Sequence, residues 1–391
     1  MTAMADSTPR RIAYWLEYPT ISGGERSLLA LVGALDRRRY EPFALMPADS
    51  PVAAALRKAG VEVAADPGDD RQRTDWLRQH TIALIHANSL AMGCRSGPLG
   101  LAAGVPAVAH VRDIMRIGRR RREALLLNRR LLAVSRAVAE ALSAQGVERA
   151  RLQVIYNGID ASAFPPRAAA AKELRHELGL AADCPVVGNV GQICLRKGQD
   201  LFLRAAGRIA AAAPDAHFAL IGARFSTKAE SRAFDSALRE TASRPPLAGR
   251  VHFLGWRADA SRLIAGLSVL AHSAHQEPLG RVLLEALAAG TPVVATAVGG
   301  TAEIIEDEVC GLLVPPADDA ALADAVLRLL DRGPLAGCLA AAGRDRVWTR
   351  FDPAVAAARV QSLYDEVLAA GRSPDSGNGR RLPDVCAGAD S

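Results

Sequence analysis

Short apolar segments alternate with longer amphipathic segments along most of the chain. The apolar segments are apolar throughout rather than at every second position, which is typical of parallel strands with helices on both faces of the sheet. In the first half they are residues 11–18, 43–47, 61–66, 82–89, 106–111 and 131–135, and in the second half residues 186–191, 217–222, 251–256, 267–273, 291–297 and 311–316. Between them lie stretches with helical periodicity, such as residues 25–36 and 135–146.

The alternation is interrupted at residues 164–185, where two adjacent prolines precede a charged helical stretch. This segment predicts a linker followed by a helix, and therefore two doubly wound, Rossmann-like α/β domains that face each other. The predicted boundaries are residues 1–165 and 166–351. Ligands of such sheets bind at the carboxyl ends of the strands, so we expect the site in a cleft between the domains.

The C-terminal part predicts one further helix and a tail. Residues 352–370 have helical periodicity, with Asp352 as N-cap and Pro353 at the first helical position. We expect this helix to complete the first domain. Residues 373–391 are rich in Ser, Gly, Pro and Asp, which predicts a disordered tail.

Composition narrows the class of protein. Half of the residues are apolar and 23% are charged, so cores can form in a chain of 391 residues. The six cysteines are scattered without a Cys-x-x-Cys pair, which predicts reduced, buried thiols rather than disulfides or a zinc site. The amino-terminal segment has no signal-peptide pattern and no stretch is apolar enough to span a membrane. These features predict a soluble, cytoplasmic protein.

Arginine is concentrated between Arg112 and Arg130 in a chain of net charge +6. Such a segment suits an anionic surface, namely phospholipid headgroups, nucleic acid or an anionic acceptor. A solvated face of an arginine-rich protein explains it equally well. Aromatic residues make up only 4% and do not interleave with the arginines, so stacking on nucleic acid is not expected. The remaining prediction is peripheral attachment at the inner face of a membrane.

Residues 272–300 contain the most informative motif. A buried strand ends in a loop, Pro278 is predicted to open a helix, and Gly290 closes it. Glu277 precedes the helix and Glu285 lies in its second turn, so two carboxylates can bind separated hydroxyl groups while helix amides favour a diphosphate. The alternatives are an ordinary N-terminal charge for Glu277 and an ion pair of Glu285 with Arg281.

Glu277, Pro278, Gly280 and Glu285, followed by Ala-Gly-Thr-Pro, Val298-Gly299-Gly300 and Glu303, resemble the donor-site signature of the family 4 retaining glycosyltransferases. That family has two facing Rossmann-like domains, the glycosyltransferase-B fold. The resemblance implies that Glu277 contacts hydroxyls of the donor sugar and that Glu285 holds the ribose of the nucleotide.

Further matches extend the resemblance over residues 11 to about 370. Gly23-Gly24 opens a helix directly after the first strand, and the family's equivalent loop faces the donor diphosphate. Lys197, in Arg196-Lys197-Gly198, matches a lysine that neutralises the leaving phosphate, although a lysine at a turn is usually only solvated.

His110 ends a strand where the family has a histidine beside the donor sugar; a histidine with satisfied hydrogen bonds in the core is the alternative. Asn157-Gly158 matches a hallmark near the linker, where Asn-Gly supplies the positive φ angles of a tight turn.

This chain departs from the family at two positions. Gln192 replaces a common arginine in the first turn of the second domain, and Leu279 replaces a frequent phenylalanine. Arg196 is the nearest residue that could restore the missing charge. The resemblance thus implies catalytic roles for Glu277, Lys197 and His110, and donor contacts for Gly23, Gly24, Gln192, Arg196, Lys197, Glu277, Leu279, Gly280, Arg281 and Glu285.

Taken together, the sequence predicts a retaining glycosyltransferase that moves a sugar from a UDP- or GDP-sugar to a lipid-linked, glycan or small-molecule acceptor. No cofactor is expected besides the nucleotide sugar itself as co-substrate. No metal is expected, because no Asp-x-Asp motif stands at a strand end to bridge a divalent ion to phosphates. Two alternatives remain open: a sugar-nucleotide epimerase or phosphorylase on the same fold, and a non-catalytic nucleotide-sugar-binding protein.

Overall fold

The first domain is built on a seven-stranded parallel sheet with the strand order β3-β2-β1-β4-β5-β6-β7. The computed structural model describes residues 8–331 and 333–370. The strands are β1 (Arg10–Trp15), β2 (Tyr40–Met46), β3 (Glu62–Ala65), β4 (Leu84–Ala87), β5 (Ala107–Val111), β6 (Arg130–Ala133) and β7 (Leu152–Val154). The helices are α1 (Gly23–Gly33), α2 (Pro51–Lys58), α3 (Asp70–Gln79), α4 (Leu90–Ala103), α5 (Arg119–Leu125) and α6 (Arg136–Ser143), with a short 3₁₀ turn η1 (Arg149–Arg151).

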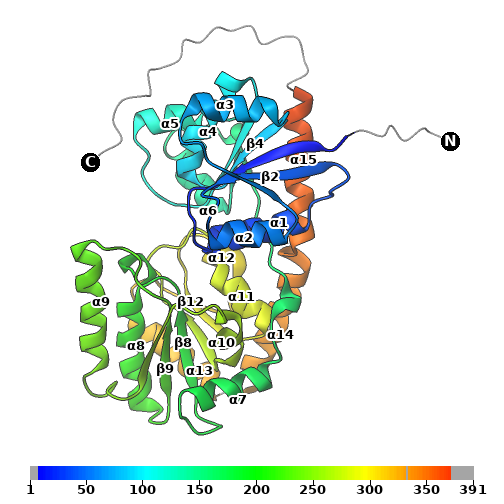
Figure 1. The fold of residues 1–391 in the computed structure, drawn as a ribbon. Coiled ribbons are helices and arrows are strands. Elements are labelled where there is room, and N and C mark those ends of the chain that lie inside the picture. The colour runs from blue at the N-terminus through cyan, green and yellow to red at the C-terminus, as the bar shows by residue number, and fades with distance from the viewer. Residues whose placement is uncertain (1–7, 332, 371–391) are drawn as a thin grey trace, which may run out of the picture.

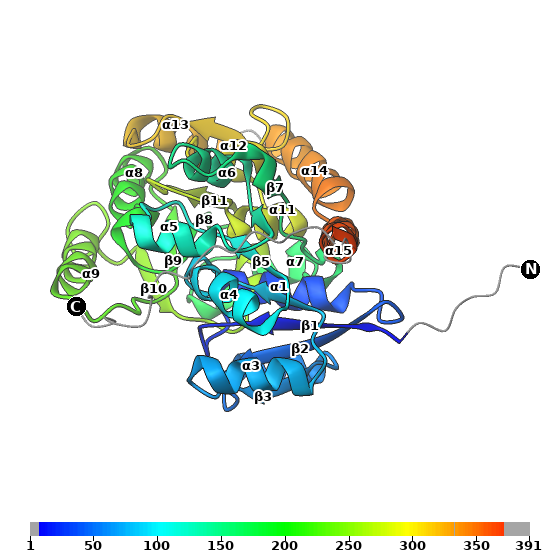
Figure 2. The same cartoon turned by 90° about the horizontal axis from the view of Figure 1, so that it is seen from above.

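Both faces of the central part of this sheet are buried, which explains the continuous apolar stretches in its strands. Ile12 and Tyr14 of β1 point into one core, with residues of α1 and α2. Ala13 and Trp15 point into the other core, with residues of α4 and α6. Figure 2 shows the strands of this domain between their helices. Successive side chains of a strand point to opposite faces, so consecutive positions in the covered part of the sheet are mostly apolar.

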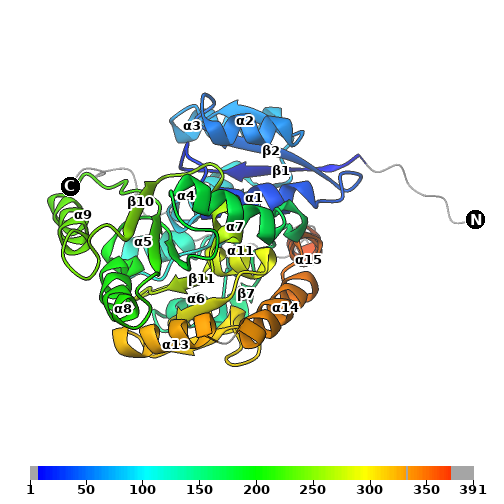
Figure 3. The ribbon, with the colours of Figure 1, turned by 90° about the horizontal axis from the view of Figure 1, so that it is seen from below.

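The second domain is built on a six-stranded parallel sheet with the order β10-β9-β8-β11-β12-β13. Its strands are β8 (Val186–Val190), β9 (His217–Ile221), β10 (Val251–Gly255), β11 (Val269–His272), β12 (Val293–Thr296) and β13 (Leu312–Val314). Its helices are α7 (Arg167–Glu177), α8 (Gln199–Ala212), α9 (Ala229–Ala242), α10 (Ala260–Gly266), α11 (Arg281–Ala289), α12 (Thr301–Ile304), α13 (Asp319–Asp331) and α14 (Gly333–Arg350), with 3₁₀ turns η2 (Ala161–Ala163) and η3 (Leu195–Lys197). Figure 3 shows α8 and α13 together on one side of this sheet and α7 and α14 elsewhere around it. Two parallel-sheet, Rossmann-like domains were predicted, and this prediction is confirmed.

The chain returns to the first domain at its end. The helix α15 (Pro353–Ala370) runs along the first domain, as Figure 1 shows, and buries Val360, Leu363 and Tyr364 in the core that contains α1. Asp352 caps this helix through its Oδ1 atom, which accepts a hydrogen bond from the amide of Ala354 at 2.6 Å. Pro353 occupies the first helical position, as predicted.

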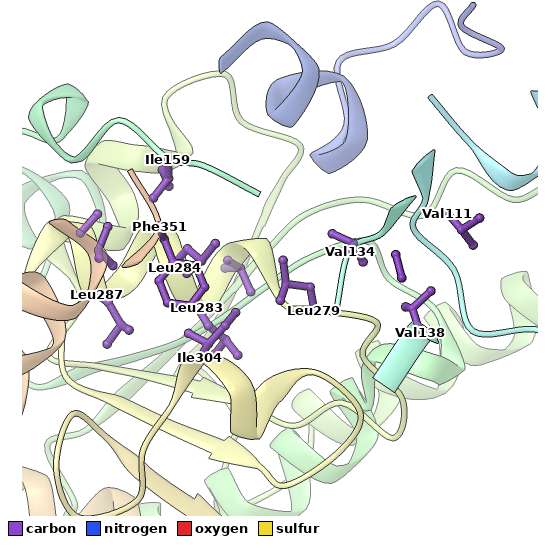
Figure 4. Close-up of a cluster of buried hydrophobic side chains, with 14 of the residues drawn as sticks. Val111, Val134, Val138, Ile159, Leu279, Leu283, Leu284, Leu287, Ile304 and Phe351 are labelled. Atoms are coloured by element: carbon purple, nitrogen blue, oxygen red, sulfur yellow. The ribbon is translucent and has the colours of Figure 1, made fainter. Parts of the chain in front are cut away.

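One apolar cluster continues from the first domain into the second. Figure 4 shows Val111, Val134 and Val138 of the first domain in the same cluster as Leu279 and Leu283 of the second. All five are buried. The two domains therefore share a buried apolar contact around the start of α11.

Several local predictions need correction. The strand β7 was not predicted, because it is three residues long and only half-buried. The helix after Glu277 begins at Arg281 rather than at Pro278, since Gly280 has φ of 101° and ends a turn. Cys338 is exposed and Cys94 and Cys194 are only half-buried, contrary to the expectation of buried thiols, whereas Cys184 and Cys310 are buried. The predicted tail 373–391 and Cys386 lie outside the described residues.

Asn157-Gly158 also differs from the prediction, since neither residue has a positive φ. The need for glycine is steric instead: a Cβ at Gly158 would lie 2.4 Å from Cα of Pro353, at the start of α15. Asn157 turns its side chain toward Arg112, whose Nη1 donates to Oδ1 at 2.5 Å.

Candidate active site

The predicted site residues come from loops that follow the carboxyl ends of the strands. The strand order reverses between β1 and β4 in the first sheet and between β8 and β11 in the second, which is where doubly wound sheets bind ligands. The two sides are in direct contact: Ser135 Oγ donates to the carbonyl of Pro278 at 2.5 Å, and Arg281 Nη1 donates to Ser27 Oγ at 3.0 Å. The domain junction therefore brings together residues from both halves of the chain.

Glu277 and Lys197 form a buried ion pair at this junction. Lys197 Nζ lies 2.5 Å from Glu277 Oε2, and the two side chains are 15% and 7% exposed. His272, at the end of β11, places Nε2 3.0 Å from the same oxygen but outside hydrogen-bond geometry. Burial, the largest single influence, raises the pKa of Glu277, but Lys197 and His272 together outweigh it and hold the pKa well below its ordinary value. Glu277 is therefore ionised, and Oε1 accepts no hydrogen bond from the described residues.

Glu277 lies in a tight turn, and the backbone of Gly299 and Gly300 packs directly against that turn. A Cβ at Gly299 would lie 2.1 Å from the carbonyl oxygen of Glu277, and one at Gly300 would lie 2.4 Å from that of Pro278. The amide of Gly300 donates to the carbonyl of Glu277 at 2.9 Å. Gly280 closes the turn in the left-handed region. The spacing of the motif thus reflects close packing of one backbone segment on another.

Glu285 lies one turn into α11 and pairs with Arg281. Arg281 Nε donates to Glu285 Oε1 at 3.0 Å, so the ion pair that was the simpler alternative for Glu285 is formed. Burial lowers the pKa of Arg281, while the charge of Glu285 acts in the opposite direction. Glu285 Oε2 accepts no hydrogen bond from the described residues, so one oxygen remains available to a ligand.

The Gly23-Gly24 loop packs against two arginines. A Cβ at Gly23 would lie 3.7 Å from Cδ of Arg281, and one at Gly24 would lie 3.4 Å from Cδ of Arg112. The helix α1 begins at Gly23, and Glu25 accepts hydrogen bonds from the amide and hydroxyl of Ser22. The loop therefore brings the amino end of a helix between guanidinium groups of both domains.

Gln192 and Leu279, where this chain departs from the family pattern, occupy different environments, and so does Arg196, the possible replacement for the missing arginine. Gln192 is half-buried, and its carbonyl accepts from Gln199 Nε2 at 3.0 Å. Arg196 is exposed, and its Nη1 donates to the carbonyl of Gln276 at 3.3 Å. Leu279 is 3% exposed in the apolar cluster at the junction, which makes its side chain part of the core.

His110 is buried beneath Arg112. Arg112 Nη2 lies 3.1 Å from His110 Nδ1, and because an arginine only donates, Nδ1 is the acceptor and the ring carries its proton on Nε2. Burial, followed by the charge of Arg112, lowers the pKa of His110 well below its ordinary value. His86, 5.7 Å away between ring centroids, binds the hydroxyl of Tyr364 through Nδ1 at 2.5 Å. Both histidines are neutral, and Arg112 lies between His110 and the Gly24 loop.

Glu303 connects the two domains through its carboxylate. Oε2 accepts from the amide of Arg136 at 2.8 Å and from the hydroxyl of Tyr156 at 2.8 Å, and Oε1 accepts from the amide of Ala137 at 3.0 Å. Ser135 Oγ accepts from the next amide, that of Val138. The amino end of α6 is thus capped from the second domain.

Sequence reasoning missed Arg112, His272 and Asn88 as members of the junction. Arg112 was assigned to a surface block, whereas the structure places it half-buried beside Gly24. The available signal was a polar residue at the carboxyl end of a buried apolar strand or directly after it, which all three share with His110.

Two cavities of the surface contain none of the predicted site residues. They have volumes of about 390 and 410 Å³ and lie at Arg129, Arg151 and Glu366 and at Arg37, Tyr40 and Glu41, away from the junction. In the described ranges, no three His, Cys, Asp or Glu side chains gather in a way that could hold a metal ion. Among the helices of residues 8–331 and 333–370, none is long and apolar enough to cross a membrane.

Comparison with known families covers both domains. A sequence model described as Glycosyltransferase Family 4 matches residues 21–163, and one described as Glycosyl transferases group 1 matches residues 184–332. The chain belongs to the group 1 glycosyltransferases. The matches include the Gly23-Gly24 loop in the first range and the segment from Lys197 to Glu303 in the second.

Proteins with similar sequences are named as glycosyltransferases. The D-inositol 3-phosphate glycosyltransferase of Mycobacteroides abscessus is 32% identical over 256 residues, which are 65% of this chain and 52% of that protein. The chain spans about half the length of such curated relatives. The crystal structure of HepE from Anabaena with UDP and glucose is 25% identical with a TM-score of 0.80, covering 90% of this chain and 99% of HepE. HepE with UDP-glucose superposes with a TM-score of 0.82 at 24% identity, covering 91% and 99%.

Proposed function

We propose that this protein is a retaining glycosyltransferase that uses a nucleotide diphosphate sugar and glycosylates an acceptor hydroxyl without a metal ion. One observation carries the proposal. Glu277 and Glu285 each place one carboxylate oxygen on a protein cation, Lys197 or Arg281, and keep the other free. Two fixed carboxylate acceptors on either side of the start of α11 suit two separate hydroxyl groups, those of a sugar and a ribose.

The residues assist the reaction by position and charge. Glu277 orients the donor sugar through its free oxygen, and Lys197 faces the leaving diphosphate. Front-face substitution then needs no protein nucleophile, because the leaving phosphate takes the proton of the acceptor hydroxyl while the bond to the sugar breaks. Helix amides and lysine stabilise the charge that develops on the phosphate. Neutral, buried His110 is a positioning residue, since its Nδ1 is occupied by Arg112.

The test is nucleotide binding and turnover by the full chain. UDP-glucose is the first donor to assay, because HepE was crystallised with it; UDP-N-acetylglucosamine and GDP-mannose follow. Slow release of nucleotide supports a transferase, a changed sugar that stays on its nucleotide supports an epimerase, and binding without turnover supports a non-catalytic protein. Glu285→Ala should abolish most nucleotide affinity in calorimetry without unfolding the protein. Unchanged affinity contradicts the assignment of Glu285.

An acceptor with an apolar part is favoured by the loops that follow the carboxyl ends of several strands. Large apolar side chains are exposed in loops directly after β1, β5, β8, β9 and β10, namely Tyr18, Met115, Leu195, Phe225 and Trp256. Ligands of doubly wound sheets bind beyond the carboxyl ends of the strands, and exposed apolar side chains commonly contribute to binding surfaces. We therefore place a lipid-linked acceptor first among the acceptor classes. A lipid-linked sugar should have a lower KM than the same sugar as a water-soluble glycoside; equal KM values contradict this.

Attachment to an anionic membrane is the second part of this proposal. Arg119, Arg120 and Arg121 are exposed in the first turn of α5, where positive charge opposes the helix dipole. Other arginines of the segment are engaged elsewhere, because Arg112 lies in the junction, Arg122 donates to the carbonyl of Gln145, and Arg130 pairs with Glu366. Arg119 also has a partner, Glu123, but their nearest charged atoms are 3.7 Å apart and both side chains are exposed. Each basic side chain near such a surface contributes about 1 kcal/mol.

Liposome co-sedimentation tests this attachment. Substituting Arg119, Arg120 and Arg121 by Gln should abolish binding to anionic vesicles. The matched control replaces Arg232, Arg239 and Arg244, on or next to α9, with the same change in net charge. Equal binding to neutral and anionic vesicles, or equal loss in both triple variants, contradicts the proposal.

A further inference from the structure

Arg112 is a half-buried cation that is held only by neutral groups. Its Nε donates to the carbonyl of Asn88 at 3.3 Å, Nη2 donates to Asn88 Oδ1 at 3.0 Å and to His110 Nδ1 at 3.1 Å, and Nη1 donates to Asn157 Oδ1. These contacts come from the ends of β4 and β5 and from the linker. Four neutral acceptors fix the guanidinium plane, so this side chain has one orientation.

No carboxylate in residues 8–331 and 333–370 lies within 4.0 Å of Arg112. Glu25 is near enough to favour its charge, but that carboxylate already caps α1 through Ser22. Burial is the largest influence and lowers the pKa of Arg112 to about 10, with the positive charge of Arg281 acting in the same direction and the carboxylates of Glu25 and Asp113 only partly opposing it. An uncompensated charge in such a place costs stability, and a bound anion would offset that cost.

The surroundings of Arg112 suit a phosphate. Gly24 packs on its side chain, and a Cβ there would lie 3.4 Å from Cδ. The amides of Gly23 and Gly24, in the first turn of α1, donate no hydrogen bond to any described residue. Arg281 flanks the other side of the loop. Free helix amides between two guanidinium groups form an anion site with contributions from both domains.

We infer that Arg112 binds the diphosphate of the nucleotide sugar from the first domain and supplies the positive charge that Gln192 lacks. This inference rests on the proposed function, because it assumes a nucleotide donor at the junction. Arg196 is the competing source of that charge; it is exposed and donates to the carbonyl of Gln276. The donor would then contact both domains, because the second domain binds its nucleoside and the first domain adds a cation. Donor binding is therefore coupled to contact between the domains.

Calorimetry with UDP and with uridine tests the inference in the full chain. Arg112→Gln should weaken UDP binding at least about 10-fold and leave uridine affinity within about 2-fold, because only UDP carries phosphates. Arg116→Gln, an exposed arginine on the same loop, is the matched control and should change neither affinity. Gln192→Arg added to Arg112→Gln should restore most of the UDP affinity.

The possible outcomes distinguish a failure of this inference from a failure of the proposed function. If the wild type binds UDP and Arg112→Gln binds it equally well, the inference is wrong, and a phosphate on the acceptor is then the other ligand of this chemistry. Equal losses for UDP and uridine also overturn it, because they indicate a merely structural role. Arg112→Lys covers the case in which Arg112→Gln does not fold, and it should bind UDP less tightly than the wild type with uridine affinity unchanged. If the wild type binds no nucleoside diphosphate, the proposed function itself fails.

Discussion

Glu303 offers the sharpest test of how the domains are held together. Its carboxylate accepts two first-turn amides of α6 and the hydroxyl of Tyr156, all across the junction, and it is 8% exposed. Removing it in Glu303→Ala leaves these donors without their partner. A lost partner costs about 1–3 kcal/mol for each buried group, and water can replace part of the loss at these part-buried amides. We expect a decrease of about 2–4 kcal/mol in the free energy of unfolding.

Thermal and urea unfolding of matched variants would measure this decrease. Glu303→Gln should lose about half as much, because its amide oxygen still accepts. The control is Glu306→Ala, which removes an exposed ion pair with Arg346 and should cost under about 1 kcal/mol. Tyr156→Phe combined with Glu303→Ala should be less destabilising than the sum of the two single variants, because they share a hydrogen bond. If Glu303→Ala unfolds like Glu306→Ala, the carboxylate does not clamp the domains.

Three further results are expected. The folded-state pKa of Glu277 is depressed below 4.5, so its ion pair stabilises the protein above that pH and loses its effect as the pH falls below it; a stability difference between wild type and Glu277→Gln that stays constant from pH 7 to pH 3 contradicts this. Gly158→Ala should lower the melting temperature by several degrees because its Cβ would meet Pro353, whereas Gly207→Ala, with open space around it, should not; similar melting temperatures for the two variants would refute the steric reason. Turnover should persist in excess EDTA, and complete loss restored by Mg²⁺ or Mn²⁺ would show that a metal is needed.

Some parts of the molecule were predictable because they depend on local pattern. Continuous apolarity predicted the parallel strands, since the central ones are covered on both faces, and the prolines and charges of residues 164–185 predicted the link between two sheets. The motif from Glu277 to Glu303 identified the family from residue types and spacing. Its helix start was misplaced, because the left-handed backbone of Gly280 depends on Gly299 and Gly300 packing beneath the turn.

Contacts between distant segments were decided only by the tertiary structure. The sequence alone determined that His110 lies at the end of a strand and that Glu277 and Lys197 follow strands of parallel sheets, but it placed Arg112 in a basic surface segment. Folding carries Asn88, His110 and Asn157 to the same guanidinium and turns a surface charge into a fixed cation beside Gly24. Gly158 is explained in the same way by Pro353, nearly two hundred positions later. Hydrophobic periodicity reports the environment of one segment, whereas charge, hydrogen bonding and close packing at the junction depend on which segments meet there.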